Sequence, residues 1–462
     1  MKRRGGEKST ALDMTQGPIL RQLVFFALPL MLGNVFQMLY NTVDSVIVGN
    51  FVGKEALAAV GSTTVIVGMI VFFFSGFSIG AGVVIGNNFG AKNMERLHDA
   101  IHTTVAAAFV LSLLLTLVGV AAVKPMLRLM RTPEDVFENA ALYLRIYLGG
   151  ISGLLIYNMG SGILRAVGDS IRPLGFLILT SILNTLLDLV FVIGLKTGIA
   201  GAAIATILSQ FVSAGLILLL LTRTEDIYRL NWKDLRIDFP ILKKIFSIGM
   251  PTALQAVITA FSNVFVQGYI NVFGSDVMAG WSCYNKLDHF IFLPIQSMST
   301  AATTFVSQNT GAGNDRRSRQ GTIQAILITC LVTGGIAALL VLFAPDAVRM
   351  FSPDAEVIRY GAMFIRTNSF FLVLNAICHV LAGSLRGEGD SRGPMIIMLL
   401  NFVLVRQIYL FWVTRFVANT PRLVGFGYPV GWVCCFVAMI LYTLYRRQKK
   451  KKTEPAAPAD PI

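Results

Sequence analysis

The residues most capable of chemistry are polar side chains that interrupt long apolar stretches. Asp44 is preceded by Asn34, Gln37 and Asn41 at intervals of three or four residues. At about 100° per residue, these four side chains share one face of a helix. That face can line a water-filled cavity, or it can form a hydrogen-bonded seam against another helix. Both interpretations stay open.

A second carboxylate shows a similar pattern. Asp188 follows Asn184 by four residues, so their side chains share a helix face. Tyr143, Asn158 and Thr206 in neighbouring apolar stretches are candidate partners. Two poorly solvated carboxylates resist being ionised together, so this set can hold a proton, or bind a small cation through its oxygens. A buried structural network would use similar residues.

The elements that must position these groups are membrane-spanning helices. Hydrophobic residues form 55% of the chain and charged residues only 14%. The apolar stretches exceed the roughly 20 residues that a helix needs to cross a bilayer. The sequence predicts an all-α integral membrane protein with about twelve spans, near 20–49, 56–86, 99–123, 138–164, 171–195, 198–222, 244–272, 277–308, 320–344, 357–385, 393–416 and 424–445.

The sequence also contains an internal repeat that spans each half of the chain. The segment 164–173, with the pattern LR-x-x-GDS-x-x-P, returns 221 positions later as 385–394. Pro18 and Pro29 return at an offset of 222 as Pro240 and Pro251. Internal repeats in membrane proteins are typical of transporters, with the substrate path between the repeats.

Each half has about six spans, an even number, which predicts parallel repeats related by a pseudo-two-fold axis along the membrane normal. We expect the linker to let the two lobes rock against each other. The predicted divisions are a tail at 1–17, an N-lobe at 18–222, a cytoplasmic linker at 223–239, a C-lobe at 240–447 and a disordered basic and Pro/Ala tail at 448–462.

The basic residues are distributed asymmetrically. With a cytoplasmic N-terminus, the inner side carries 26 of the 39 lysines and arginines. This follows the positive-inside rule and predicts a multi-pass protein of the cell inner membrane with both termini cytoplasmic. The net charge of +14 therefore indicates membrane topology and not nucleic-acid binding. A cleaved signal peptide is not expected.

Signs of enzyme chemistry are absent from the sequence. It contains no HExxH, GxSxG or GxxxxGK[ST] pattern. The five cysteines lie in apolar spans without CxxC spacing, which favours packed, inert thiols over metal ligation. We expect no catalytic residues and no cofactor.

The two halves differ at the candidate site. Asp44 corresponds to Val266, and Asn158 to His379. The carboxylate site is therefore predicted in the first half only. The second half has its own charged residues, which we interpret mainly as an internal ion-pair network: Lys286, Asp288, His289, His379 and Arg406.

Several of these segments resemble the multidrug and toxic compound extrusion (MATE) transporters. The resemblance covers about 15–447 and rests on the first helix ending in 43–49, the paired LR-x-x-GDS-x-x-P turns, the segment 183–188 and the turn at 90–93. Within the family, the chain is most similar to the DinF-like branch.

The resemblance implies two six-helix lobes in a V shape that export organic cations in exchange for H⁺ or Na⁺. It implies a coupling site at positions matching Asp44, Asn184, Asp188 and Thr206, where Na⁺ is one candidate ion, with Tyr143 and Asn158 alongside. Pro29 matches a proline at which the first span bends. A second-lobe Na⁺ site of a related branch is expected to be missing, because Thr259 and Asn375 replace its carboxylates.

The leading hypothesis is a monomeric cation-coupled efflux antiporter for lipophilic organic cations in the lipid bilayer. Asn34, Gln37 and Asn41 would line the substrate cavity, and Pro29 would act as a hinge. The alternative is a flippase or exporter of a lipid-linked or other amphipathic metabolite. A membrane-embedded enzyme lacks any nucleophile or metal constellation. The sequence does not choose between H⁺ and Na⁺ or identify the substrate.

Overall fold

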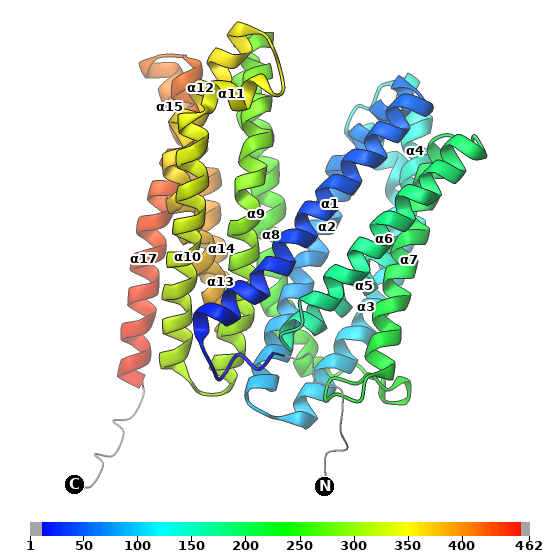
Figure 1. Ribbon diagram of the computed structural model, residues 1–462, viewed down its shortest axis with the longest axis vertical. Helices are drawn as coiled ribbons and strands as arrows, with labels where there is room; N and C mark the ends of the chain where they lie inside the picture. Colours follow the sequence, from blue (N-terminus) through cyan, green and yellow to red (C-terminus); the bar gives the residue numbers. More distant parts are fainter. Residues whose placement is uncertain (1–11, 454–462) are drawn as a thin grey trace. The chain divides into compact units, whose positions relative to one another are not determined.

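The computed structural model describes residues 12–453, and this part of the chain is helical without a β-strand (Figure 1). The main helices are α1 (Ile19–Phe51), α2 (Lys54–Gly90), α3 (Met94–Leu129), α4 (Glu134–Gly149), α5 (Ile151–Ala166), α6 (Ile171–Asp188), α7 (Ile199–Arg223), α8 (Phe239–Asn271), α9 (Ser275–Gly311), α10 (Asp315–Leu342), α12 (Ala355–Asn368), α13 (Leu372–Gly387), α14 (Arg392–Leu399), α15 (Arg406–Trp412) and α17 (Gly427–Thr453). Shorter elements are α11 (Ala344–Arg349) and α16 (Pro421–Gly425), the π-helices η1 (Leu189–Gly194), η4 (Leu400–Val405) and η5 (Val413–Val417), and the 3₁₀ turns η2 (Trp232–Asp234) and η3 (Ser369–Phe371).

These helices occupy the predicted spans, and several of the spans are broken, including the span at 171–195, which ends in the π-helix η1. The span at 138–164 is formed by α4 and α5, which bend by 47° at Gly150. The spans at 357–385 and 393–416 contain 3₁₀ and π-helical turns. Among the described residues, ten helices are long and apolar enough to cross a membrane, or eleven if the bent pair is one span. The helix α9 occupies the predicted span at 277–308 but is too polar to be among them.

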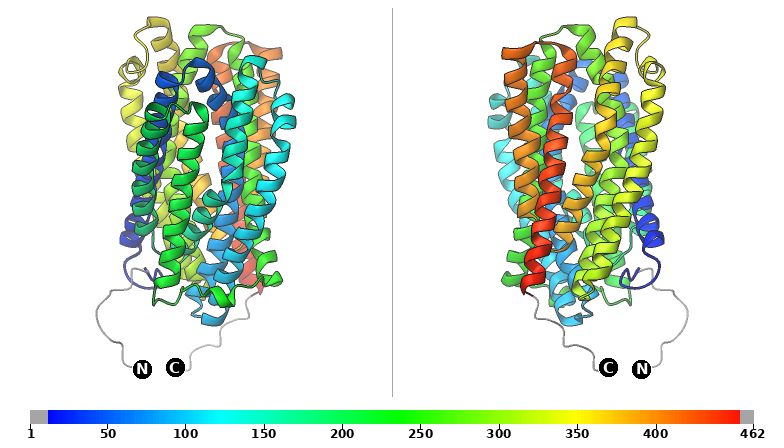
Figure 2. Two further views of the ribbon diagram at one scale, coloured as in Figure 1. Left: turned by 90° about the vertical axis from the view of Figure 1, so that its right-hand side faces the viewer. Right: turned by 90° about the vertical axis from the view of Figure 1, so that its left-hand side faces the viewer.

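The chain folds into two compact units. Among the described residues, unit 1 comprises 12–257, 303–321 and 387–389, and unit 2 comprises 258–302, 322–386 and 390–453. The boundary cuts through α8 and α9, so the second half of the sequence contributes helix ends to unit 1. Within each unit the long helices run side by side (Figure 2).

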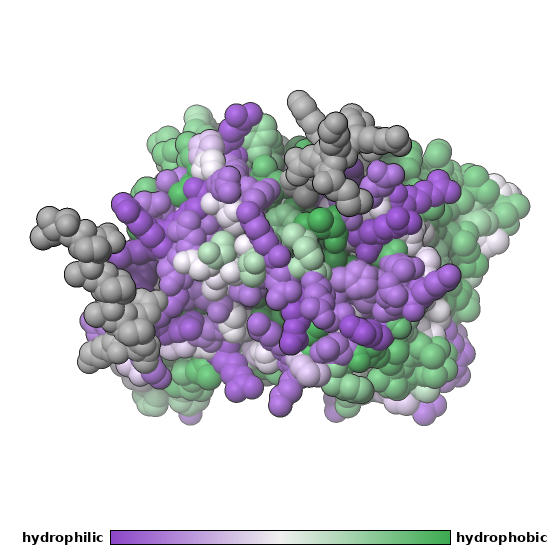
Figure 3. Space-filling view, turned by 90° about the horizontal axis from the view of Figure 1, so that it is seen from below, coloured by the Kyte–Doolittle hydropathy of each residue, from purple (hydrophilic) through white to green (hydrophobic). Residues whose placement is uncertain are grey.

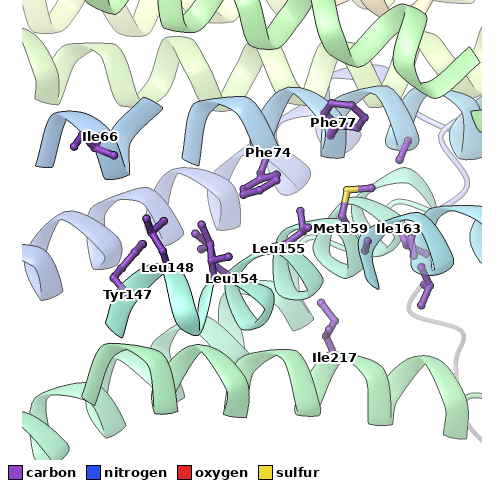
Figure 4. Close-up of a cluster of buried hydrophobic side chains, with 14 of the residues drawn as sticks. Ile66, Phe74, Phe77, Tyr147, Leu148, Leu154, Leu155, Met159, Ile163 and Ile217 are labelled. Atoms are coloured by element: carbon purple, nitrogen blue, oxygen red, sulfur yellow. The ribbon is translucent and has the colours of Figure 1, made fainter. Parts of the chain in front are cut away.

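The core of unit 1 is built from α2, α4, α5 and α7. Figure 4 shows Phe74 of α2 beside Leu155 of α5, with Phe77 and Met159 about one turn further along the two helices. All four side chains are almost completely buried. This core fixes the helices on which the candidate site residues lie.

The core of unit 2 has a different character, because aromatic rings dominate one end of it. Trp281 packs edge-on against Phe364, with ring centroids 4.8 Å apart, and also contacts Tyr284 and Tyr428. A second cluster, which includes Leu381, is more aliphatic.

One hydrogen-bond pattern occurs in both units at repeat-related positions. In unit 1, the Ser78 hydroxyl donates to the Asn158 carbonyl over 2.7 Å and accepts from Arg165 Nη2 over 3.2 Å. In unit 2, the Ser299 hydroxyl donates to the His379 carbonyl over 2.7 Å and accepts from the Arg386 guanidinium over 3.3 Å. Because all three positions are offset by 221, these contacts agree with the predicted duplication.

The linker is hydrogen-bonded to the start of α3. Asn231 N–H donates to His102 of α3 over 3.0 Å, and Asp238 N–H donates to Thr103 Oγ1 over 3.0 Å. Arg236 forms a 2.5 Å ion pair with Asp99. The start of α3 thus presents polar side chains that satisfy backbone groups of the linker.

Polar side chains gather on the end of the molecule seen in Figure 3, whereas apolar side chains predominate at its edges. The flanks of the helices expose many large apolar residues, including Leu113, Leu117 and Leu331. A water-soluble protein rarely exposes apolar surface on this scale. The distribution fits a protein whose flanks contact lipid.

Candidate functional site

The two predicted carboxylates both lie in unit 1, on helices that pack together. Asp44 is in α1, and Asp188 is the last α-helical residue of α6 before the π-helix η1. Single π-helical turns in α-helices often mark functional sites, because they displace a side chain from the regular register. The side chain of Asp188 is fully buried, and Asp44 is 9% exposed.

The structure brings these carboxylates into one electrostatic neighbourhood. Asp44 and Asp188 are near enough for their charges to interact. Both also interact with the hydroxyl groups of Tyr143 from α4 and Tyr40 from α1. Side chains from α1, α4 and α6 thus interact electrostatically with one another.

The polar atoms of this cluster lack hydrogen-bond partners. Among the described residues, no partner is found for Asp44 Oδ1, for either carboxylate oxygen of Asp188, or for either amide atom of Asn184. Buried polar atoms are normally paired, since each unpaired group costs about 1–3 kcal/mol. A fully satisfied hydrogen-bonded seam between helices would not leave so many polar atoms without partners.

The donor set fits a small hard cation. Carboxylate oxygens from Asp44 and Asp188 and the amide oxygen of Asn184 are the ligand types that such cations prefer. Thr206 in α7 is buried as well, and its hydroxyl donates to the Ala202 carbonyl over 3.0 Å, which leaves oxygen lone pairs available. The same carboxylates can instead share a proton.

The remaining predicted residues lie in different surroundings. The Asn158 amide donates to the Leu154 carbonyl of its own helix over 2.8 Å, and no contact within the described residues joins it to the carboxylates. Asn34 is half-buried, whereas Gln37 and Asn41 are exposed. The predicted polar stripe of α1 thus divides into a buried end at Asp44 and a more accessible part. Pro29 lies inside α1, which continues as one helix to Phe51.

Sequence reasoning missed three residues of the cluster. Tyr40 precedes Asp44 by four residues, and Tyr147 follows Tyr143 by four, with their rings stacked at 6.1 Å. Gln210 follows Thr206 by four, and its side chain hydrogen-bonds the Tyr147 hydroxyl. Each is one helical turn from a predicted site residue, and this spacing was the signal available in the sequence.

The charged residues of unit 2 do not form the predicted ion-pair network. Within the described residues, no ion pair joins Lys286, Asp288, His289 or Arg406. Their partners are neutral groups: Lys286 lies over the Phe351 ring, Asp288 accepts from the Tyr284 hydroxyl over 3.4 Å, and Arg406 donates to Ser262 over 2.7 Å and lies over the Tyr428 ring. The aromatic core described above separates these charges, which explains the error.

His379 is also not part of an ion pair. Its ring packs edge-on against Phe292, with centroids 4.9 Å apart, and lies 6.2 Å from the Phe402 ring. Thr259 and Asn375 each have a buried oxygen without a partner among the described residues. Neither side chain supplies a carboxylate.

One group of side chains outside this site has metal-ligand geometry. The ligand atoms of His98, His102 and Asp234 lie within 4.8 Å of one another. However, His102 Nδ1 donates to the His98 carbonyl over 2.7 Å, while its Nε2 accepts from Asn231 N–H. Asp234 accepts from the Asn231 amide over 2.7 Å. These atoms are already engaged in holding the linker, so the group serves as a structural network.

The chain is similar to characterised transporter families along nearly its whole length. The sequence model of the family MatE matches residues 29–190 and 248–412. A relative from Bacillus subtilis, "Probable multidrug resistance protein YpnP", is 29% identical over 450 residues, covering 96% of this chain and 98% of that protein. Another from Thermotoga maritima, "Probable multidrug resistance protein NorM", is 28% identical over 445 residues, covering 94% and 91%.

Solved structures agree with this result. The structure described as "Outward-facing conformation of a multidrug resistance MATE family transporter of the MOP superfamily" matches with a TM-score of 0.90 and 25% identity. The match covers 97% of this chain and 100% of that one.

Proposed function

The chain belongs to the MATE family of membrane transporters, and we propose that it is an efflux antiporter that exports organic, lipophilic cations in exchange for H⁺ or Na⁺. The observation that carries this proposal is the buried pair Asp44 and Asp188 with its unpartnered oxygens. The relatives whose printed names refer to multidrug resistance support the export of varied small molecules.

The coupling mechanism follows from electrostatics. With no ion bound, the two carboxylates present negative charge to the interior of unit 1, and an organic cation is attracted to it. A proton bound to either carboxylate, or Na⁺ bound at Asp44, Asn184, Asp188 and Thr206, reduces this negative charge by one unit. A ligand can shift a conformational equilibrium only through its different affinity for the two states. Competition for the same carboxylates therefore couples the inward movement of one cation to the outward movement of the other.

The first helix is the element on which both events act. Asp44 belongs to the coupling site, whereas Asn34, Gln37 and Asn41 on the same helix are accessible to a substrate. Pro29 removes one backbone N–H from α1 and so permits bending. We propose that ion binding at Asp44 changes the bend of α1 at Pro29 and thereby weakens substrate binding.

The test is transport by the full chain in proteoliposomes, with pH and Na⁺ gradients imposed separately. Asp44→Asn and Asp188→Asn should each reduce gradient-driven efflux of a lipophilic cation by at least about tenfold, because an amide cannot exchange a proton. Asp135→Asn is the matched control, since Asp135 is an exposed carboxylate in the same unit. Full gradient-driven transport by both site variants would refute the mechanism.

A second candidate is export or flipping of an amphipathic anion, such as a lipid-linked metabolite. It is favoured by Arg386 and Arg406 in unit 2, which are 8% and 3% exposed and have no carboxylate partner within the described residues. An anionic substrate would be attracted to these guanidinium groups and repelled by the carboxylates of unit 1. Efflux of anions that survives Asp44→Asn but is lost in Arg406→Gln would favour this candidate.

A further inference from the structure

A short segment before α1 is held by several hydrogen bonds to α9 and α10. Residues 12–18, here called the strap, are the dark blue coil that leads into α1 (Figure 1). Met14 is fully buried, and both polar atoms of its backbone are taken by side chains of α9. Its N–H donates to Gln308 Oε1 over 2.9 Å, and its carbonyl accepts from Asn309 Nδ2 over 3.1 Å.

The strap is fastened at two further points. Arg317 at the start of α10 donates from Nε to the Met14 carbonyl over 3.1 Å and from Nη2 to the Gly17 carbonyl over 2.8 Å. The same Nη2 donates to the Gln22 side chain over 2.8 Å. At the other end of the strap, the Leu12 carbonyl lies so close to Gly168 that a Cβ there would approach it to 2.2 Å.

The strap covers a crossing of two repeat-related helix ends. A Cβ on Gly90 of α2 would lie 1.8 Å from the Gln308 carbonyl oxygen, and one on Gly311 of α9 would lie 1.9 Å from the Asn87 carbonyl oxygen. Gly90 corresponds to Gly311 and Asn87 to Gln308 at the same offset of 221, so the contact is reciprocal. Self-complementary contacts of this kind lie on a two-fold axis. All of these residues belong to unit 1.

The linker, like the strap, precedes the first helix of one repeat and binds a helix of the other repeat. The strap precedes α1 and binds α9 and α10, which come from the second repeat. The linker precedes α8, the counterpart of α1, and binds α3, the counterpart of α10. Its contacts are Asn231 to His102, Arg236 to Asp99 and Asp238 to Thr103. Each repeat thus sends its leading segment across to the other repeat.

We propose that the strap and the linker form a reciprocal clasp, in which the strap holds α9 at its crossing with α2 and the linker holds α3, and that the clasp must release before this end of the transporter can open. The proposal extends the alternating access implied by the proposed function. Release would have to break the side-chain hydrogen bonds to Met14 and separate the two glycine contacts. The clasp therefore acts as a conformational lock distinct from the coupling site.

The first experiment measures opening without any gradient or substrate, so it does not depend on the proposed ion coupling. Ser307 is fully buried at the crossing beside Gly86 and is replaced by cysteine in a chain without its native cysteines. Its rate of labelling by a membrane-impermeant maleimide reports the opening of the crossing. Arg317→Ala should speed labelling by about tenfold, which corresponds to about 1.4 kcal/mol.

Matched controls separate the clasp from a general loss of charge. Arg316→Ala removes an exposed arginine next to Arg317 and should leave the labelling rate unchanged. On the linker side, Asp99→Asn should speed labelling, whereas Glu225→Gln at an exposed linker position should not. If Arg317→Ala fails to fold, Met14→Ala and its exposed neighbour Gln16→Ala provide the same comparison. Equal rates in the clasp variants and their controls would overturn the proposal.

A second experiment asks whether the clasp opens during transport. Met14→Cys and Asn309→Cys, joined by a cleavable thiol cross-linker, should stop efflux until the cross-link is cleaved. Each single cysteine treated in the same way should transport normally. Continued efflux with the cross-link intact would show that the strap stays in place throughout the cycle, and the lock would be refuted.

Discussion

Replacing Gly90 with alanine tests how closely the ends of α2 and α9 approach each other. The added Cβ would lie 1.8 Å from the Gln308 carbonyl oxygen, whereas ordinary van der Waals contact begins at 3.4 Å. The helices would have to separate by about 1.6 Å, the difference between these two distances. Because the clashing atom belongs to a helix backbone, it cannot move aside by changing a rotamer.

The cost can be bounded from known core substitutions. Overpacking that forces backbone shifts typically costs about 1–3 kcal/mol. Alanine in a helix gains roughly 0.5–1 kcal/mol over glycine where there is room for it. A Cβ added to Gly68 in the same helix would meet no atom within 4 Å. We therefore expect Gly68→Ala to be neutral or stabilising and Gly90→Ala to be destabilising, with a difference of about 1.5–4 kcal/mol.

The assay is the unfolding free energy of the purified full chain in a mild detergent, measured by reversible denaturant titration. Gly311→Ala should resemble Gly90→Ala, because its Cβ meets the Asn87 carbonyl at 1.9 Å. The double variant should cost less than the sum, since either substitution alone already separates the same crossing. If Gly90→Ala proves as stable as Gly68→Ala, the close approach of these helix ends is wrong, and the reciprocal clasp loses its basis.

Three further predictions concern contacts outside the crossing. Tyr228→Phe removes the hydroxyl that accepts from Arg172 over 2.9 Å, so the linker should be cut several-fold faster by protease, while exposed Ile227→Val should have no effect. Burial raises the pKa of the Tyr228 hydroxyl above its ordinary value of 10.0. The neutral hydroxyl therefore stabilises the fold below pH 10, and this stabilisation is lost as the pH rises through the higher pKa of the folded state. An alkaline-active protease should cut the linker faster only in that pH range. Cys283, Cys378 and Cys435 are buried free thiols, so an impermeant maleimide should leave them unlabelled in the folded chain and react after denaturation, and labelling of the folded chain would contradict their packing.

Much of the fold could be predicted because membrane helices are specified by composition and repeats. The apolar stretches located the spans to within a few residues, and the offset of 221 located the repeated turns. What the sequence could not show was the division into units, because packing and not chain order decides which helix ends belong together. The end of α9 and the start of α10 belong to unit 1 because of the glycine contacts and the hydrogen bonds to the strap. A hydropathy pattern does not predict either kind of contact.

The candidate site was predicted in part for a similar reason. Asp44, Asn184 and Asp188 stand out because charged and amide groups are rare in apolar spans. Tyr40 and Tyr147 do not stand out, since tyrosine is tolerated in such helices, and only the three-dimensional arrangement shows that Tyr40 interacts with the carboxylates and that Tyr147 packs against Tyr143. The predicted ion-pair network of the second half failed because sequence proximity of Lys286, Asp288 and His289 says nothing about the aromatic rings between them and Arg406.

The boundary that passes through α8 and α9 has a consequence for genetics. Unit 1 contains residues 303–321 from the second half of the gene. A lesion at Gln308 or Arg317 should therefore resemble lesions near Met14, although the codons are about 300 positions apart. Second-site suppressors of such lesions should appear in the opposite half of the gene. Two co-expressed half-genes would restore function only if the two polypeptides assemble, because unit 1 needs residues from both. The duplicated halves therefore depend on each other to fold.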